Sequence, residues 1–279
     1  MTDTQPSVSR TRRAGPSTLG VGARRGYIEI RQFLRERDAV VFTLGFPVGL
    51  MILFASIFHG EIAHTGVDYR QVFISGMIAS GIMSTSFSSL AISIAQERDD
   101  GTLKRLVGTP MPRASYFIGK VILVLATGLL ETVILLVIGT LFYGLHLPGT
   151  AGRWLTLAWV FVLSLIACSL LGIAMSSVPR SGRAAAAVVQ PPFILLQFIS
   201  GVYFLFSALP KGLQQFAAIF PLKWMTQGLR SVFLPDTFTT QEAAHSWEHG
   251  KMALVLAAWC VGGLVLCLRT FRWKGRRDG

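Results

Sequence analysis

Charged residues are scarce in this sequence of 279 residues, where Asp, Glu, Lys and Arg together make up 14%. An ordinary soluble domain has about 25% charged residues. Acidic side chains are the rarest of these, with 14 against 26 lysines and arginines, whereas hydrophobic residues make up 52%. A chain of this length cannot bury so much apolar surface in one water-exposed core, so the composition excludes an ordinary soluble protein.

Cysteine is also rare, and no catalytic or metal-binding pattern stands out. Cys168, Cys260 and Cys267 fall within apolar runs and lack metal-type spacing, which is typical of small buried side chains. His245 and His249, with Glu248 between them, have a spacing that suits zinc on a helix, but no further ligand is specified. We therefore predict no metal site and, in the absence of a catalytic triad or carboxylate pair, no enzyme.

Long apolar runs are what the sequence has in abundance. An α-helix needs about 20 apolar residues to cross a hydrocarbon layer about 30 Å thick. Six such runs are present, at about 39–58, 71–95, 117–145, 154–178, 184–206 and 252–271. The sequence therefore predicts an all-α polytopic membrane protein with six transmembrane helices, in a single transmembrane domain over 24–271.

The distribution of basic residues predicts the orientation. An even number of spans places both termini on one side, and that side holds 20 of the 26 lysines and arginines. An excess of basic residues marks cytoplasmic segments, so we expect cytoplasmic N- and C-termini. The net charge of +12 is then a topology signal, and no basic folded soluble face suggests nucleic-acid binding.

The segments outside the spans have distinct compositions. Residues 1–23 are rich in Ser, Thr, Arg and Gly and predict a disordered cytoplasmic tail, and 272–279 form a basic cytoplasmic tail. Apolar side chains at helical spacing then favour a helix lying in the membrane interface, namely Tyr27, Ile30, Phe33 and Leu34. The alternative is a simple cytosolic extension of the first span.

The charged segment between the second and third runs, residues 97–120, has the pattern of a short helix. Leu103, Leu106 and Val107 lie on one stripe, and Pro110 and Pro112 end the helix. Such a rigid segment on the cytoplasmic side is where a separate force-generating subunit could act on the membrane helices. The alternative is a solvated loop whose charges only set the topology.

These residues resemble the signature of the ABC-2 family of ABC-transporter permeases, in which a Glu is followed by Gly-Thr-Leu, Thr-Pro, a basic residue and Gly-Lys. The C-terminal half adds Ser200-Gly201, Leu209-Pro210, Pro221-Leu222 and Leu229-Arg230 in the family's order. The resemblance covers nearly the whole chain and is strongest to the actinobacterial branch related to daunorubicin permeases. Pro112 departs from the family, where relatives often carry a small residue such as Ser.

The resemblance implies that the loop holds a coupling helix, which docks into a cleft of an ATPase subunit. The ATPase-contact candidates carried over on matching positions are Glu97, Gly101, Thr102, Leu103, Leu106, Thr109, Pro110 and Arg113.

The motor itself is not expected on this chain. A P-loop needs a Gly-rich turn that ends in Gly-Lys-Ser/Thr, and Gly119-Lys120 is followed by Val121. We therefore expect no cofactor on this chain, and ATP and Mg on a separate ABC ATPase present in two copies. A second permease copy, identical or related, would complete the assembly in a bacterial plasma membrane.

The segment 207–250 is too long and apolar to be an idle connector. Two helical patterns in it, near 213–220 and 224–232, predict short extracellular helices that either re-enter the membrane or lie on the outer leaflet. By resemblance we favour helices that close the extracellular mouth, with Pro221, Trp224 and Arg230 as gate candidates.

Four further residues are candidates for the substrate pathway. Glu131 lies near the middle of the third run, where ionisable groups are costly and often functional. Its alternative role is as a structural partner for a neighbouring helix. Gln190, Pro191 and Gln197 interrupt the fifth run, where consecutive prolines predict a bend that lines the pathway or merely adjusts packing.

The function predicted from these observations is the permease subunit of an ATP-driven exporter of a hydrophobic or amphipathic compound, such as a drug, antibiotic or lipid-like molecule. Export of a polysaccharide or lipid-linked product is an alternative within the same family. An ATPase-independent transporter or scaffold is the alternative of a different class.

Overall fold

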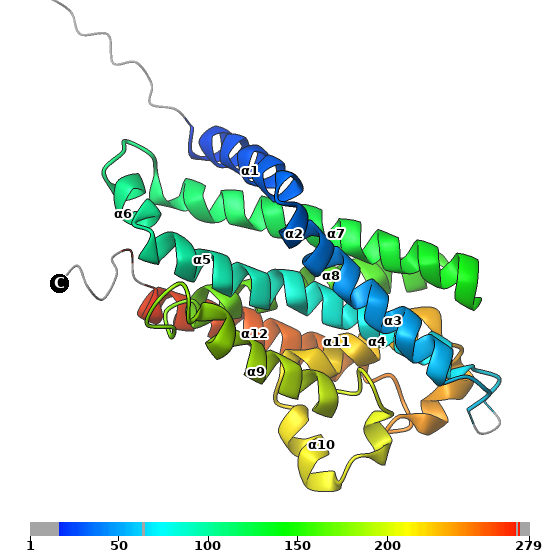
Figure 1. Ribbon diagram of the computed structural model, residues 1–279. Helices are drawn as coiled ribbons and strands as arrows, with labels where there is room; N and C mark the ends of the chain where they lie inside the picture. The colour runs from blue at the N-terminus through cyan, green and yellow to red at the C-terminus, as the bar shows by residue number, and fades with distance from the viewer. Residues whose placement is uncertain (1–16, 63–64, 272, 274–279) are drawn as a thin grey trace, which may run out of the picture.

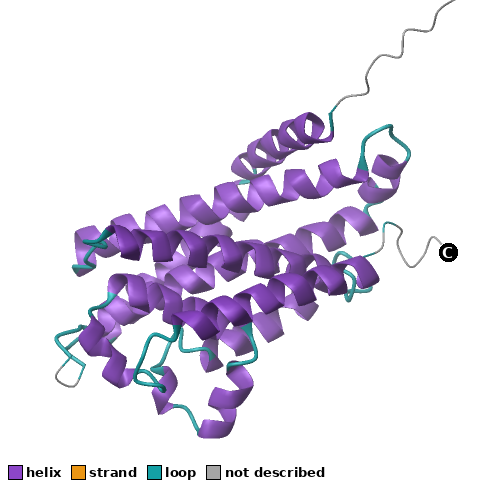
Figure 2. Ribbon diagram, turned by 180° about the vertical axis from the view of Figure 1, so that it is seen from behind, coloured by secondary structure: helices purple, strands orange, loops and turns teal. Residues whose placement is uncertain are grey.

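The computed structural model describes residues 17–62, 65–271 and 273. Throughout these residues the regular elements are helices, and the only β-type pairing is an isolated bridge between Glu61 and Asp68. Figure 1 shows the helices running roughly alongside one another as a bundle, and Figure 2 shows it from behind. The predicted all-α membrane fold is confirmed.

Five helical segments are long and apolar enough to cross a membrane, namely Arg37–Ile57, Tyr69–Asp99, Arg113–Tyr143 (α7), Ala151–Met175 (α8) and His249–Thr270 (α12). The first consists of α2 (Arg37–Val40), the π-helical η1 (Val41–Gly45) and α3 (Phe46–Ile57). The second consists of α4 (Tyr69–Met83), the π-helical η2 (Ser84–Ser89) and α5 (Leu90–Asp99). These segments match five of the six predicted spans.

The remaining predicted span, 184–206, is shorter than expected. Helix α9 covers only Ala185–Ile199, or 15 residues, which is about 22 Å at 1.5 Å per residue. The chain then leaves the helix and turns at Gly201, whose φ of +81° favours glycine. Its length places α9 apart from the five candidate spans, among the shorter apolar helices.

The segment from α4 to α5 is the centre of the bundle. Helix α4 packs against α3, α7, α8 and α11 (Pro221–Phe233), and every residue from Val72 to Met83 is buried. Gly172 of α8 crosses η2 closely, since a Cβ there would lie 2.8 Å from the carbonyl oxygens of Ser86 and Phe87. The π-helical turn therefore sits in a tight crossing.

Helix α1 (Thr18–Arg35) lies along the outside of α7 (Figure 1). The Ser17 side chain caps its first turn by accepting from Gly20 N, so the predicted disordered tail to residue 23 is wrong for residues 18–23. The tail's first 16 residues lie outside the described residues. Gly22 and Gly26 face α7, where added Cβ atoms would meet Ile118 and Ile122 at 2.6 and 2.7 Å. Tyr27 and Leu34 of the predicted apolar face stay exposed.

The two ends of the bundle differ. One end holds α1, the short helix α6 (Thr102–Val107) and the C-terminal end of α12 (Figure 1). Most of the predicted basic tail, 272 and 274–279, lies outside the described residues.

The chain from α9 to α12 forms η3 (Phe206–Ala208), α10 (Lys211–Ala217), α11 (Pro221–Phe233) and η4 (Asp236–Gln241). All 13 residues of α11 are buried, and it packs against α4, α8 and α12, so it inserts into the bundle.

Candidate coupling site and pathway residues

The connection between α5 and α7 forms the predicted short helix. Helix α5 ends at Asp99, and Gly101 adopts a left-handed φ of 73° that redirects the chain into α6. The six residues of α6 end before Gly108, and Pro112 precedes the first residue of α7. Glycine and proline thus delimit a compact projecting turn between two long helices.

The α6 turn has a buried side and an exposed side. Leu103 is fully buried in the main core and Leu106 packs against it. Leu103 and Leu106 of the apolar stripe therefore anchor α6 to its own bundle, whereas Val107 is exposed. Gly101 and Thr102 are half-buried. The exposed residues define a surface that we call the α6 tip, which consists of Lys104, Arg105, Val107, Gly108, Thr109, Pro110 and Arg113.

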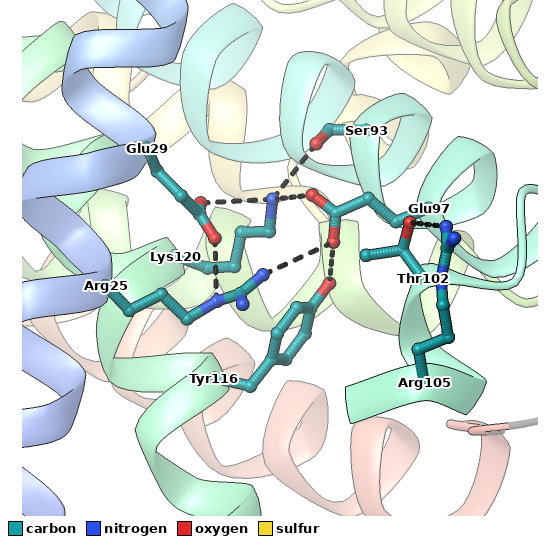
Figure 3. Close-up of polar contacts among 8 residues, drawn as sticks. All are labelled: Arg25, Glu29, Ser93, Glu97, Thr102, Arg105, Tyr116 and Lys120. Carbon is teal, nitrogen blue, oxygen red and sulfur yellow. Dashed lines mark hydrogen bonds and ion pairs between the residues drawn. The ribbon is translucent and has the colours of Figure 1, made fainter. Parts of the chain in front are cut away.

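Glu97 lies in a polar cluster that joins three helices behind this tip (Figure 3). Lys120 Nζ of α7 lies 2.5 Å from Glu97 Oε1 of α5 and 3.1 Å from Glu29 Oε2 of α1. Lys120 also donates to Ser93 Oγ at 3.1 Å. The ammonium group is only 2% exposed, so its contacts with two carboxylates offset the cost of burying its charge.

Arg25 and Tyr116 complete the cluster. Arg25 Nε lies 3.0 Å from Glu29 Oε1, and its guanidinium carbon stacks 4.8 Å from the centre of the Tyr116 ring. The Tyr116 hydroxyl donates to Glu97 Oε2 at 2.8 Å. Two cations therefore balance two carboxylates. Burial raises the pKa of the Glu29 carboxyl above its ordinary value, although Lys120 and Arg25 oppose the effect.

Sequence reasoning singled out Glu97 but missed the cluster's other members as a site. Glu97 points toward Lys120 and Tyr116 within its own chain, whereas Thr109, Pro110 and Arg113 are exposed on the tip. The four-residue spacing of Arg25 and Glu29 on α1 was the available signal, since it places both side chains on one helix face.

Glu131 is buried deep in the bundle. Its carboxylate is 1% exposed and has no hydrogen-bond partner within the part of the chain that the structure describes. It lies against Gly81 of α4, where an added Cβ would come within 2.4 Å of Glu131 Oε1. The alternative role of Glu131 is to pair with a polar group on a neighbouring helix. The residue it lies against on α4 is instead Gly81, whose lack of a side chain leaves space for the carboxylate.

The three candidates on α9 are not equivalent. Pro191 and Pro192 lie inside a continuous helix, with Pro191 exposed and Gln190 half-buried. Gln197 is buried, and its Oε1 accepts a hydrogen bond from the Tyr203 hydroxyl. Gln197 therefore ties α9 to the turn that follows it.

The gate candidates belong to the inserted helix α11. Pro221 occupies its first turn, and Trp224 Nε1 donates to Ala218 O at 2.8 Å. Arg230 lies 3.3 Å from Glu242 with both side chains 2% exposed, and it donates to Gly201 O at 2.5 Å. Burial lowers the pKa of the Arg230 guanidinium, and Glu242 opposes the effect. Arg230 thereby joins α11 to the segments before and after it.

A bundle of apolar helices with a polar tip at one end and an inserted helix within it has the architecture of a polytopic membrane protein. The family described as "ABC-2 type transporter" matches residues 26–234, which is more than half of the chain. The chain therefore belongs to this family.

Two relatives from Escherichia coli K12 illustrate the similarity. "Probable multidrug ABC transporter permease YbhR" is 27% identical over 175 residues, which cover 61% of this chain. The match spans slightly less than half of that relative's length, at 45%. "Inner membrane transport permease YadH" is 27% identical over 217 residues, covering 74% of this chain and 80% of that protein.

Proposed function

We propose that this chain is the membrane-spanning subunit of an ATP-driven exporter and that it docks a separate ABC ATPase through the α6 tip. The observation that carries the proposal is the construction of α6. Its apolar side is anchored in the core by Leu103, while its polar side is exposed over the tip. A docking element needs both features. Its exposed side must bind the ATPase, and its buried side must pass the resulting movement to the transmembrane helices.

The polar cluster behind the tip would distribute that force. Lys120 contacts carboxylates from both α1 and α5 while residing on α7. A displacement of α6 by the ATPase therefore acts on the two long helices that flank it and, through Glu29, on α1. We propose that closure of the ATPase pair on ATP moves these three helices as a unit and opens the pathway outward.

The remaining assignments follow from this role. ATP and Mg would bind the ATPase, in two copies, and a second permease copy would complete the pathway within a bacterial inner membrane. The end that carries the α6 tip would then be cytoplasmic. The names of YbhR and YadH, a probable multidrug permease and an inner membrane transport permease, support a hydrophobic or amphipathic cargo.

Co-purification of the permease with its ATPase tests the docking proposal. Arg105→Glu reverses a charge on the tip, and Arg24→Glu makes the same change at an exposed position on α1. We expect Arg105→Glu to lower both ATPase recovery and the stimulation of ATP hydrolysis at least several-fold, while Arg24→Glu retains both. Equal recovery and stimulation for the two variants would contradict docking at the tip.

A further inference from the structure

A cleft of about 400 Å³ opens beside the polar cluster, between α1, α5 and α7. Its lining includes the charged residues Glu29, Glu36, Glu97, Asp100 and Lys120, of which Glu36 and Asp100 are exposed. It also includes the hydroxyl residues Thr85 and Ser89 on η2 and Thr127 on α7, of which Thr85 and Thr127 are buried. We take the exposed charged side as the mouth of the cleft and the buried hydroxyl side as its inner end.

The inner end of this cleft lies next to Glu131. Thr127 precedes Glu131 by four residues on α7, and Gly81 precedes Thr85 by four residues on the facing helix, so each pair shares one helix face. The rise along the helix axis from Thr127 to Glu131 is about 6 Å. A single water molecule bridges a gap of that size.

Among the residues that the structure describes, no charged side chain donates a hydrogen bond to the Glu131 carboxylate. Among the elements that pack closely against α7, α3 and η2 have no titratable residue, and α4 has only Tyr69 and Arg70 in its first turn. Helix α8 has Arg153 in its first turn and Cys168 further along. The charged groups on α1 and α7 that line the cleft are Glu29 and Lys120, which pair with each other. Lys120 precedes Glu131 by eleven residues, about 16 Å along the helix.

An ionised carboxylate that is 1% exposed and lacks a partner would cost far more than a neutral one. We propose that Glu131 is a proton-binding site that is occupied in this conformation and that exchanges its proton with solvent through the cleft, past Thr127 and Thr85. Transport would then be linked to proton binding at Glu131 in addition to ATP hydrolysis. The site itself does not depend on the docking proposal, because it is defined within the permease alone.

Infrared spectroscopy of the purified permease, labelled with ¹³C-glutamate and without ATPase, tests the site directly. We expect a carbonyl stretch of protonated glutamic acid at neutral pH that disappears in Glu131→Gln. Glu131→Asp removes the same labelled band and serves if the first variant does not fold. The control Glu36→Gln, at an exposed position that lines the cleft, should leave the band of the protonated carboxyl group in place. If the Glu131 variants instead lose an ionised carboxylate band, Glu131 carries a negative charge, for example because it binds a metal cation. That result would overturn the proposal.

The access route is tested by the rate at which that band shifts after transfer to D₂O. Thr127→Val should slow the exchange several-fold. Thr140→Val is the matched control, because Thr140 lies further along α7 and its hydroxyl bonds to backbone carbonyls three and four residues earlier, as that of Thr127 does. Equal exchange rates for the two variants and the wild type would overturn the route through the cleft.

Discussion

Lys120 Nζ lies 2.5 Å from Glu97 Oε1, and this contact joins α7 to α5 across the whole α6 connection. The same ammonium group reaches Glu29 on α1 at 3.1 Å. Lys120, a buried cation, therefore fastens α7 to both α5 and α1. This arrangement is the physical basis for treating them as one moving body.

Lys120→Met should be the most damaging change within the cluster. It leaves two carboxylates without their shared cation, and breaking a buried ion pair from one side costs about 3–5 kcal/mol. Glu97→Gln keeps an acceptor for the Tyr116 hydroxyl and should cost less, about 1–2 kcal/mol. Unfolding of the detergent-solubilised protein by denaturant measures both. Lys104→Met, at an exposed site on the tip, should change the free energy of unfolding by less than about 0.5 kcal/mol.

Gly81→Ala should destabilise the bundle because its Cβ would lie 2.4 Å from Glu131 Oε1. Overpacking of this kind costs about 1–3 kcal/mol. In the Glu131→Ala background the carboxyl group is gone, so the same substitution should cost much less. A double-mutant cycle measured by thermal unfolding gives the coupling. Additive effects would show that Gly81 does not make room for Glu131.

Lys223 predicts a pH dependence of stability. Burial lowers its pKa to about 8, with Glu248 and Glu242 opposing the shift, whereas an unfolded lysine has a pKa of about 10.4. Between these values the unfolded state binds more protons, so the free energy of unfolding should rise with pH, by about 3 kcal/mol in total.

Lys223→Met should flatten this rise when unfolding is measured from pH 7 to pH 10. Lys251→Met is the matched control, because Lys251 also contacts Glu248 but is 73% exposed. An unchanged pH profile in Lys223→Met would contradict the assignment of the rise to Lys223.

Glu242→Ala should destabilise the inserted helix strongly. It leaves the charge of Arg230 buried without its carboxylate, at a cost of about 3–5 kcal/mol. The pair Arg153–Asp236 has the same 3.3 Å separation but side chains 31% and 80% exposed. Arg153→Ala should therefore cost less than about 1 kcal/mol. Similar losses in the two variants would show that burial does not set the strength of the Arg230 pair.

The fold was predictable from the sequence wherever apolar length alone decides it. Five spans and the short helix α6 follow from hydropathy, the Leu103 spacing and the flanking prolines. The end of α9 was not predictable in this way, because residues 200–206 are apolar and the turn depends on Gly201 and on its contact with Arg230.

The candidate site was predictable only in part, because a motif gives order along the chain and not the direction of a side chain. Glu97 and Leu103 were read as outward contacts, yet both face their own bundle. Two partners of Glu97, Arg25 and Lys120, are 72 and 23 residues away from it along the chain. The packing of α1 on α7 leaves only one local signal in the sequence, the two glycines Gly22 and Gly26 that lie against α7.

The measurement that tests the account most directly is site-specific photo-crosslinking of the permease to its ATPase. A crosslinking residue at Thr109, exposed on the α6 tip, is compared with one at Gly149, exposed between α7 and α8 at the other end of the bundle. We expect an ATPase adduct from position 109 and none from position 149. An adduct from position 149 with none from position 109 would contradict the account.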